Sequence, residues 1–146
     1  MVFVVDTNIL VYAANKDCIE HEPCYALLHS LRTEPTAWYI TWGILYEFLR
    51  VITHPRVLEQ PWSTAQALSF VSSCLASSSL NILAETSRHL KVADEIFRTL
   101  PLLSGNLVYD ARTAILMKEN GLSKIYTRNT DFHRFPFINV VDPLIN

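Results

Sequence analysis

The first eight residues constrain the fold more than any other segment of the chain. An apolar run from Val2 to Val5 ends at the polar triplet Asp6-Thr7-Asn8, and apolar residues at helical spacing follow at once. A run without polar alternation is typical of a strand buried on both faces, as in a parallel sheet covered by helices. The chain therefore begins like an α/β protein, with a carboxylate directly after its first strand.

Strands and helices are expected to alternate along the rest of the chain. Apolar periodicity predicts four more strands, at 38–41, 80–84, 124–127 and 137–141, and helices whose apolar faces span 9–14, 24–31, 44–52, 67–74, 90–100 and 107–117. Ser63, Ser87 and Asn106 are the predicted N-caps, Pro101 ends one helix, and Asn120-Gly121 form a predicted C-cap. This order predicts a three-layer α/β/α sandwich around a central, mainly parallel sheet.

Size and composition favour one compact domain. The chain has 146 residues, half of them hydrophobic, which is enough for a single core over residues 1–146 but not comfortably for two domains. The net charge of −2 gives no overall attraction to nucleic acid or membrane, so any such partner must be bound locally. No apolar run approaches the roughly 18 residues of a membrane span, and no signal peptide is apparent. We expect a cytoplasmic protein that has no membrane partner and keeps its three cysteines reduced.

Four acidic residues occupy positions that the predicted sheet would bring together. Asp6, Glu47, Asp110 and Asp131 follow strands or lie in the adjoining first turns of helices. Each has an ordinary explanation by itself, as a helix cap, a solvated helical residue or a turn former. In an open parallel sheet, however, these positions share the carboxyl edge where ligands bind. Clustered carboxylates repel one another, so the pattern indicates a hard cation such as Mg²⁺ or Mn²⁺.

Four segments of the chain resemble the motifs of the PIN-domain family, in the family's order. They are V-V-D-T-N-I-L-V-Y-A (4–13), the acidic helix at 42–57, G-N-L-V-Y-D-A-R-T-A-I-L-M-K-E-N-G (105–121) and Y-T-R-N-T-D-F-H-R-F-P (126–136). Among PIN domains, the chain is most similar to the single-domain VapC toxins of VapBC toxin–antitoxin pairs. The resemblance implies a PIN-like sandwich fold and a metal-dependent endoribonuclease that hydrolyses structured RNA such as tRNA or rRNA. It also implies a VapB-like antitoxin as partner and a homodimer.

The resemblance assigns roles to individual residues. Asp6, Glu47 and Asp110 match the three acids expected to hold the metal and to act in catalysis. The fourth motif departs from the pattern, because Asn129 stands where many relatives have an acid, and Asp131 matches the second acid of that motif. Asn129 is therefore expected as an uncharged metal ligand through its amide oxygen, with Asp131 as a further catalytic acid. The number of metal ions stays open.

Several neighbouring residues could support such a site. Thr7, Asn8 and Thr127 could position the carboxylates, although turn and cap roles explain them equally well. Arg50, Arg112 and Arg128 lie beside the acidic motifs and could grip phosphates, or could pair with nearby acids. Three aromatic residues could stack on bases, although core packing is the expected role: Trp42, Tyr46 and Tyr109.

Two other functions compete with the nuclease hypothesis. A non-catalytic PIN-fold module that binds RNA or protein is favoured by the departure at Asn129, whereas the presence of Asp6, Glu47 and Asp110 together argues against it. A phosphotransferase of the haloacid-dehalogenase type also has an Asp after its first strand. That class needs a second acid two residues further on, and this chain has Asn8 there.

Overall fold

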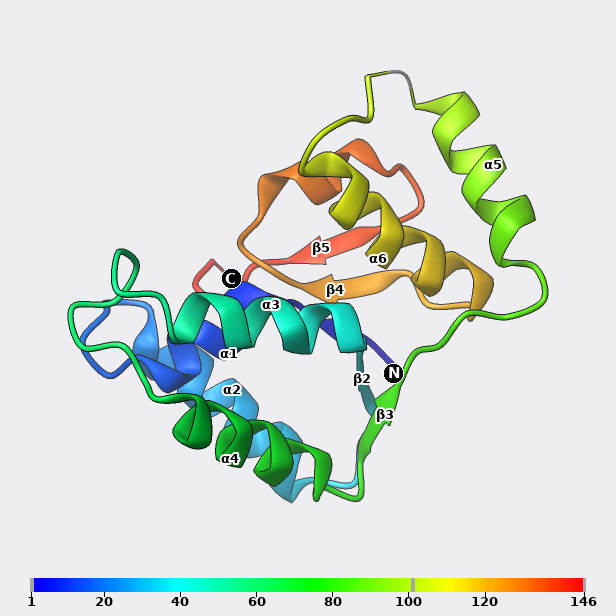
Figure 1. Cartoon of the computed structure of the whole chain (residues 1–146). Helices are drawn as coiled ribbons and strands as arrows, with labels where there is room; N and C mark the ends of the chain where they lie inside the picture. The colour runs from blue at the N-terminus through cyan, green and yellow to red at the C-terminus, as the bar shows by residue number, and fades with distance from the viewer. Residues whose placement is uncertain (1, 101, 146) are drawn as a thin grey trace.

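The sheet is parallel throughout and has five short strands. The structure is a computed structural model that describes residues 2–100 and 102–145, so the predicted helix stop at Pro101 and both terminal residues lie outside the described residues. The strand order is β3-β2-β1-β4-β5 (Figure 1). The strands are β1 Val4–Val5, β2 Trp38–Ile40, β3 Leu80–Ile82, β4 Lys124–Tyr126 and β5 Asn139–Val141. The prediction of a parallel sheet is confirmed, and its central strand is the apolar run at the start of the chain.

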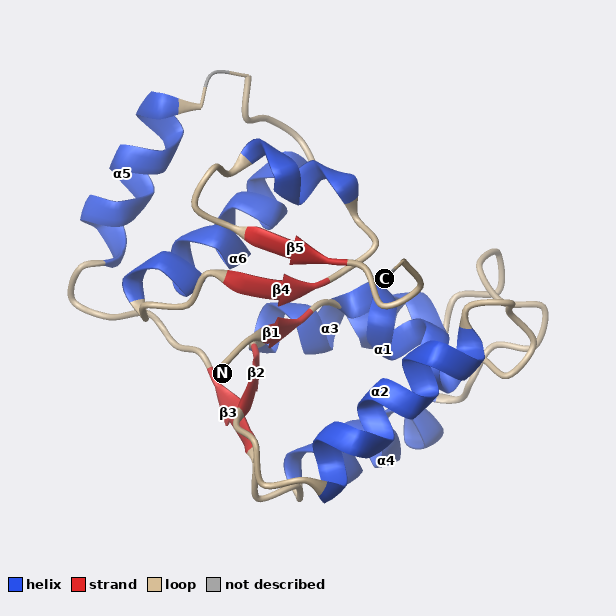
Figure 2. Ribbon diagram, turned by 180° about the vertical axis from the view of Figure 1, so that it is seen from behind, coloured by secondary structure: helices blue, strands red, loops and turns tan. Residues whose placement is uncertain are grey.

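Helices cover both faces of this sheet, as the sandwich prediction required. They are α1 Thr7–Ala14, α2 His21–Thr33, α3 Trp42–Ile52, α4 Thr64–Leu75, α5 His89–Thr99 and α6 Leu107–Glu119, with a 3₁₀ helix η1 at Thr130–Arg134. Helices α1 to α4 gather on one side of the sheet, and α5 and α6 lie on the other (Figures 1 and 2). Within the layers, α1 packs on α2 and α3, and α5 packs on α6.

The position of β1 decides where a ligand can reach the sheet. Val4 pairs with Tyr39 of β2 on one side and with Ile125 of β4 on the other. The chain continues from β1 to β2 and β3 in one direction and then returns to β4 on the opposite side of β1. Such a reversal of strand order opens a crevice outside the carboxyl ends of the strands on either side of it. Residues that follow β1 and β4 therefore face this crevice.

Two of the predicted helix ends are confirmed in atomic detail. Ser63 caps α4 in a reciprocal capping box, in which its hydroxyl accepts from Gln66 N (3.1 Å) and the Gln66 side chain accepts from Ser63 N (2.9 Å). Gly121 has a φ of +75° just after α6, where a side chain would be strained. The turn is closed by a hydrogen bond from Leu122 N to the Met117 carbonyl (2.8 Å), as in a Schellman motif.

Two other predicted caps are wrong. Ser87 does not cap α5, because the helix begins at His89 and the Thr86 hydroxyl instead accepts from Arg88 N (3.1 Å). Asn106 occupies the N-cap position of α6, but its side chain makes no capping hydrogen bond. Its φ of −64° and ψ of −22° are already helical, and a side-chain cap needs an extended backbone at this position.

The core is formed by both faces of the sheet. Trp38, Phe48, Phe132 and Phe135 are its largest fully buried side chains. Cys24 and Cys74 are buried and Cys18 is partly buried, and none of the three forms a disulfide in the described residues. In the described part of the chain, no helix combines the length and the apolar character needed to cross a membrane.

Candidate active site at the carboxyl edge of the sheet

Asp6 is the most deeply placed acid of the site. It directly follows β1 and is 7% exposed. It is the N-cap of α1, since its Oδ1 accepts from Thr7 N at 2.8 Å. Its second oxygen accepts from the Thr127 hydroxyl at 2.7 Å and from Asn8 Nδ2 at 3.1 Å. A capping role and a functional role therefore coincide in one side chain, whose orientation is held by three donors.

Thr127 and Asn8 form the link between β1 and β4 that holds this carboxylate. Thr127 follows β4 and is fully buried. Besides donating to Asp6, its hydroxyl accepts from Asn8 Nδ2 (3.0 Å) and from Asn129 N (2.9 Å). Asn8 Oδ1 in turn accepts from the Arg128 amide at 3.0 Å. The structure thus places both residues in direct contact with the acidic site, as predicted.

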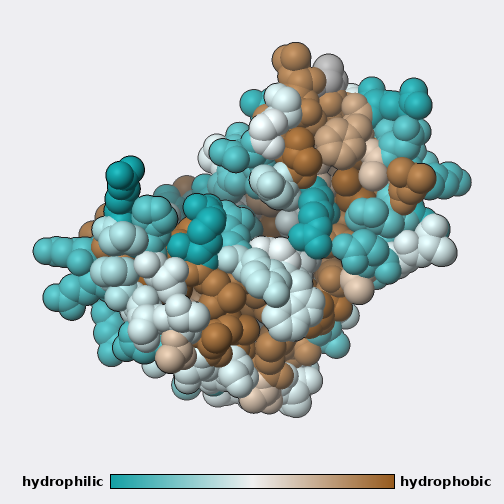
Figure 3. Space-filling view, in the orientation of Figure 1, coloured by the Kyte–Doolittle hydropathy of each residue, from teal (hydrophilic) through white to brown (hydrophobic). Residues whose placement is uncertain are grey.

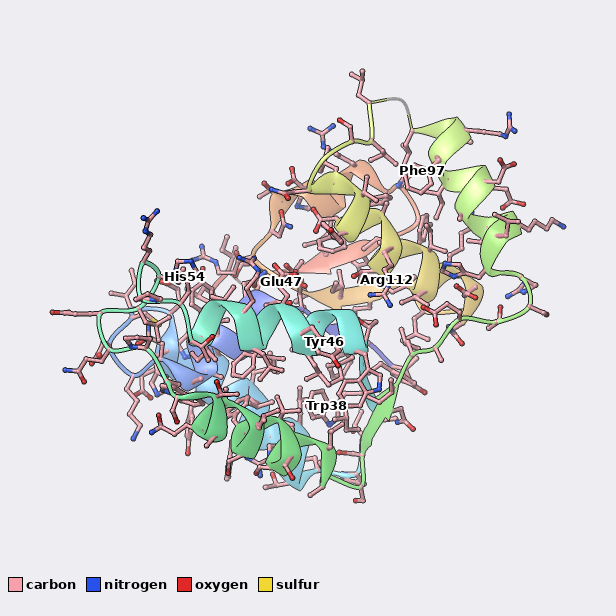
Figure 4. The ribbon with its side chains drawn as sticks, in the orientation of Figure 1. Trp38, Tyr46, Glu47, His54, Phe97 and Arg112 are labelled. Carbon is pink, nitrogen blue, oxygen red and sulfur yellow. The ribbon has the colours of Figure 1, made fainter. Side chains whose placement is uncertain are left out.

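Glu47 and Asp110 approach Asp6 from two helices. Glu47 lies on α3, and its Oε2 is 3.4 Å from the Thr7 hydroxyl, which is also 3.3 Å from the Ile44 carbonyl oxygen. Asp110 lies in the first turn of α6, and its Oδ2 accepts from Asn129 Nδ2 at 3.3 Å. Glu47 points from α3 toward α6 across the carboxyl edge (Figure 4). Four elements, β1, α3, α6 and the segment after β4, thus contribute to one site.

The proximity of these acids changes their titration. Burial raises the pKa of Asp6 above its usual value, and the nearby Glu47 carboxylate raises it further, against the hydrogen bonds from Thr127, Thr7 and Asn8. Burial also raises the pKa of Asp110 to about 6, helped by the charges of Asp6, Asp131 and Glu47 and opposed by the hydrogen bond from Asn129. The repulsion expected from the sequence pattern is therefore present between these groups.

Asn129 and Asp131 both lie near Asp110 but in different surroundings. The Asn129 oxygen caps η1 by accepting from Asp131 N at 3.0 Å, so that its NH₂ group faces Asp110. The amide thus presents a donor to Asp110 in this structure, and its role as a metal ligand through the oxygen stays a prediction. The Asp131 side chain is 47% exposed and lies 3.8 Å from Arg134 Nε. It lines the outer cleft, and its charge helps to raise the pKa of Asp110.

Two adjoining pockets share Glu47, Asp110 and Asn129 in their linings. The inner pocket, of about 250 Å³, reaches Asp6, Thr7 and Asn8 and has an apolar wall. That wall was not anticipated from the sequence and consists of Val11, Tyr12, Val51 and Val57. The outer cleft, of about 530 Å³, runs between α3 and α6 and is lined by Gly43, Ile44, Glu47, Arg50, Asn106, Tyr109, Asp110, Arg112, Thr113, Asn129 and Asp131. Figure 3 shows hydrophilic residues along the hollow between the part of the molecule that contains α3 and the part that contains α6.

The three predicted cationic residues separate into two groups. Arg50 and Arg112 line the outer cleft. The Arg128 side chain instead bonds Asp142 Oδ2 at 3.1 Å and lines neither pocket, so only its backbone supports the site, through Asn8. Phosphate binding by the Arg128 side chain stays a prediction.

The aromatic residues are more exposed than their predicted core role requires. Tyr109, Tyr46 and Trp42 are 70%, 68% and 48% exposed, respectively. Tyr109 lines the outer cleft, whereas Tyr46 lies on the edge of α3 that faces away from α6 (Figure 4). Core packing was therefore the wrong expectation for these side chains. The apolar spacing used to predict core positions did not distinguish these three residues from buried ones, because exposed aromatic residues on a helix can follow the same spacing.

The donor set suits a hard cation that keeps part of its water. Among residues 2–100 and 102–145, no three acidic, His or Cys side chains are already drawn together tightly enough to enclose a metal ion. Mg²⁺ is commonly held by one or two carboxylates and several waters, so it does not require such an enclosure. The charge of Asp6 helps to raise the pKa of Asp110, and both side chains offer only oxygen atoms as ligands. These residues therefore fit a partly hydrated Mg²⁺ or Mn²⁺.

Sequence comparisons point to one family. The model of the PIN domain family matches residues 3–138. The ribonuclease VapC33 of Mycobacterium tuberculosis is 30% identical over 141 residues, with 97% of each chain covered. The similarity thus extends over nearly the full length of both proteins.

Solved structures agree with this result. The chain superposes on VapBC2 from Rickettsia felis, bound to a DNA fragment from its promoter, with a TM-score of 0.69 at 23% identity over 97% of this chain and 98% of the other. It superposes on the sarcin-ricin loop cleaving toxin VapC20 of Mycobacterium tuberculosis with a TM-score of 0.65 at 18% identity, over 90% and 92% of the two chains. At these identities the comparison supports the fold.

Proposed function

The chain belongs to the PIN-domain family, and from this premise we propose that it is a metal-dependent endoribonuclease, the toxin of a VapBC-type toxin–antitoxin pair. One observation carries the proposal. Asp6, Glu47 and Asp110 come from separate elements and meet at the carboxyl edge, where burial and the charges of the neighbouring carboxylates raise the pKa of Asp110 to about 6. Clustered, partly buried carboxylates destabilise the fold when they are ionised. A bound cation would replace their mutual repulsion by attraction to the cation.

Mg²⁺ or Mn²⁺ is the proposed cofactor. When bound, such an ion lowers the pKa of a coordinated water and stabilises negative charge on phosphoryl oxygens. Asp6 and Asp110 are the proposed direct ligands. Thr7 N, Asn8 and Thr127 hold the Asp6 carboxylate in one orientation, and the Asn129 amide does the same for Asp110.

Glu47 is the proposed group that orients the attacking water. Its carboxylate lies beside the Thr7 hydroxyl at the junction of the inner pocket and the outer cleft. Attack of water on phosphorus forms one P–O bond and breaks the bond to the 3′ oxygen, which takes up a proton. The products are a 5′-phosphate and a 3′-hydroxyl. Asp131 stands at the rim, and we assign it to substrate contact instead of direct chemistry.

The proposed substrate is structured RNA, such as a tRNA or an rRNA loop, in the cytoplasm. One structural relative is described as a sarcin-ricin loop cleaving toxin, which makes an exposed RNA loop a reasonable first choice. Several structural relatives were solved as VapBC complexes, and this supports a VapB-like antitoxin as the protein partner. A homodimer is part of the same proposal.

Cleavage of end-labelled tRNA and rRNA tests this function directly. The wild-type protein, Asp6→Asn and the matched control Asp94→Asn are compared with Mg²⁺, Mn²⁺ or EDTA; Asp94 is an exposed acid on α5. We expect discrete cuts that require the metal, disappear in Asp6→Asn and persist in Asp94→Asn. Intact RNA across a broad panel, with no cation binding by calorimetry, would overturn the proposal and favour a non-catalytic binding module.

A further inference from the structure

Gly43 and Arg112 meet across the outer cleft. Gly43 lies in the first turn of α3, and Arg112 lies on α6, 69 positions later in the chain. A Cβ at position 43 would overlap Nη1 of the Arg112 guanidinium, far inside van der Waals contact. Figure 4 shows the Arg112 side chain between α6 and the start of α3, on the same side of α3 as Glu47. The guanidinium therefore rests on the bare backbone of Gly43.

This glycine is not explained by the needs of the helix. Glycine within a helix costs roughly 1 kcal/mol relative to alanine. Gly43 shows no left-handed backbone, unlike Gly105 and Gly121, so its conformation does not call for glycine. What the missing Cβ provides is room for the guanidinium.

The position of this guanidinium is also electrostatically unusual. It lies at the N-terminal end of α3, where the helix dipole is positive and repels a cation. Its ion partner among the described residues is Glu85, whose Oε1 is 3.3 Å from Nη2 and whose side chain is 50% exposed. An exposed pair of this kind contributes little to stability. The Arg112 guanidinium therefore has N–H donors beyond the one that bonds Glu85, and it lies beside the N-terminus of α3, which also favours an anion.

The outer cleft supplies the reason for an anion at this position. Its floor carries Glu47 and Asp110, which repel an RNA strand unless cations on the walls hold the phosphates. Arg50 and Arg112 are the arginines that line it. A guanidinium binds phosphate oxygens through a planar pair of N–H donors. The strength of this interaction depends on how well the guanidinium is held in place.

We propose that Arg112 binds a phosphate of the RNA strand next to the bond that is cut, and that Gly43 is the positioning residue that seats the Arg112 guanidinium in the outer cleft. This inference rests on the proposed ribonuclease function. Glu85 holds the guanidinium loosely in the absence of RNA and yields to the phosphate.

The geometry makes Gly43→Ala an unusually selective test. The obstructed atom is the end of a flexible side chain, so the added methyl group moves the guanidinium by about 1 Å or more without disturbing the backbone. Alanine also favours the helix, so the variant should fold at least as well as the wild type. A loss of RNA affinity in a protein of unchanged or higher Tm is then a consequence of the displaced guanidinium.

The experiment is a double-mutant cycle of Gly43→Ala and Arg112→Gln, read as kcat and KM for RNA cleavage. Arg98→Gln is the matched control, because Arg98 also lies on a helix and pairs with one exposed acid, Asp94, but does not line the cleft. We expect Arg112→Gln to raise KM about tenfold, as for loss of one partly exposed charge-assisted hydrogen bond, with little change in kcat. Gly43→Ala should raise KM in the wild-type background and have no further effect on Arg112→Gln.

The salt dependence of RNA binding gives a second readout that a purely structural role would not change. Binding of a fluorescent single-stranded RNA is measured in the non-cleaving Asp6→Asn background. The slope of log K against log salt should fall by about 0.7 when one phosphate contact is lost through Arg112→Gln. Unchanged KM and slope in a protein that cleaves normally would overturn this inference alone, whereas absence of cleavage by the wild type would overturn the proposed function.

Discussion

Asp110→Asn should make the metal-free protein more stable while it abolishes RNA cleavage. In the folded chain, burial and the charges of Asp6, Asp131 and Glu47 raise the pKa of Asp110 from 3.8 to about 6. Asparagine has nearly the same shape, keeps an oxygen that can accept from Asn129 Nδ2, and carries no charge. The substitution thus removes the repulsion without opening a cavity.

The size and sign of the effect follow from this shift. Because the pKa of Asp110 is higher in the folded than in the unfolded chain, the folded state is fully stabilised by protonated Asp110 below about pH 4. This stabilisation is lost as the pH rises through about 6 and Asp110 ionises in the folded chain. A shift of about two pH units corresponds to roughly 3 kcal/mol, and solvent screening of this partly exposed side chain reduces it to about 1–2 kcal/mol. For a domain of this size, Tm at pH 8 should rise by roughly 3–6 °C.

Thermal unfolding in EDTA at pH 4.5 and pH 8 measures this difference. Asp110→Asn should exceed the wild type in Tm at pH 8 and approach it at pH 4.5, while Asp94→Asn on α5 should match the wild type at both. Added Mg²⁺ should stabilise the wild type more than Asp110→Asn. A variant that is less stable than the wild type at pH 8, or equally shifted at both pH values, would refute the idea of a strained acidic site.

Three further predictions follow from the same contacts. Cleavage by the wild type should increase with pH through about 6, as Asp110 ionises, and rising Mg²⁺ should move this onset to lower pH because the cation competes with the proton; a flat profile would contradict it. Thr127→Val removes a donor to Asp6 and should lower kcat about tenfold at pH 7, whereas Thr127→Ser should restore it. Glu119→Gln should lower the free energy of unfolding by about 1–3 kcal/mol in urea without changing kcat, because this buried carboxylate joins α6 to His89 and to the Thr86 amide before α5.

The buried Glu119 also illustrates what local patterns miss. Its side chain is fully buried and accepts from Thr86 N and Oγ1 at 2.6 and 2.7 Å. Although burial by itself raises a carboxyl pKa, the hydrogen bonds from Thr86 and His89 bring the pKa of Glu119 below its usual value. In the sequence it is an ordinary acid at the end of a helix, because its partners lie 30 residues or more away.

The predicted site was most accurate where local sequence places a residue at the end of a strand. Asp6 follows a buried apolar run and Thr127 follows the strand that pairs beside it, so a parallel sheet brings them to one edge. Asp110 was placed correctly because it lies in the first turn of a helix that begins at that same edge. Side-chain direction was less predictable, as the outward Arg128 and the reversed amide of Asn129 show.

The sequence by itself determined the order of the elements, the parallel sheet and the edge at which the acids gather. These features follow from apolar periodicity and from short-range turn and cap preferences, which a few neighbouring residues encode. Only the tertiary structure decided that Thr127 donates to a carboxylate 121 residues away and that Gly43 makes room for Arg112. Such contacts depend on how whole helices and strands pack, and that packing is the sum of many distant interactions that no local pattern contains.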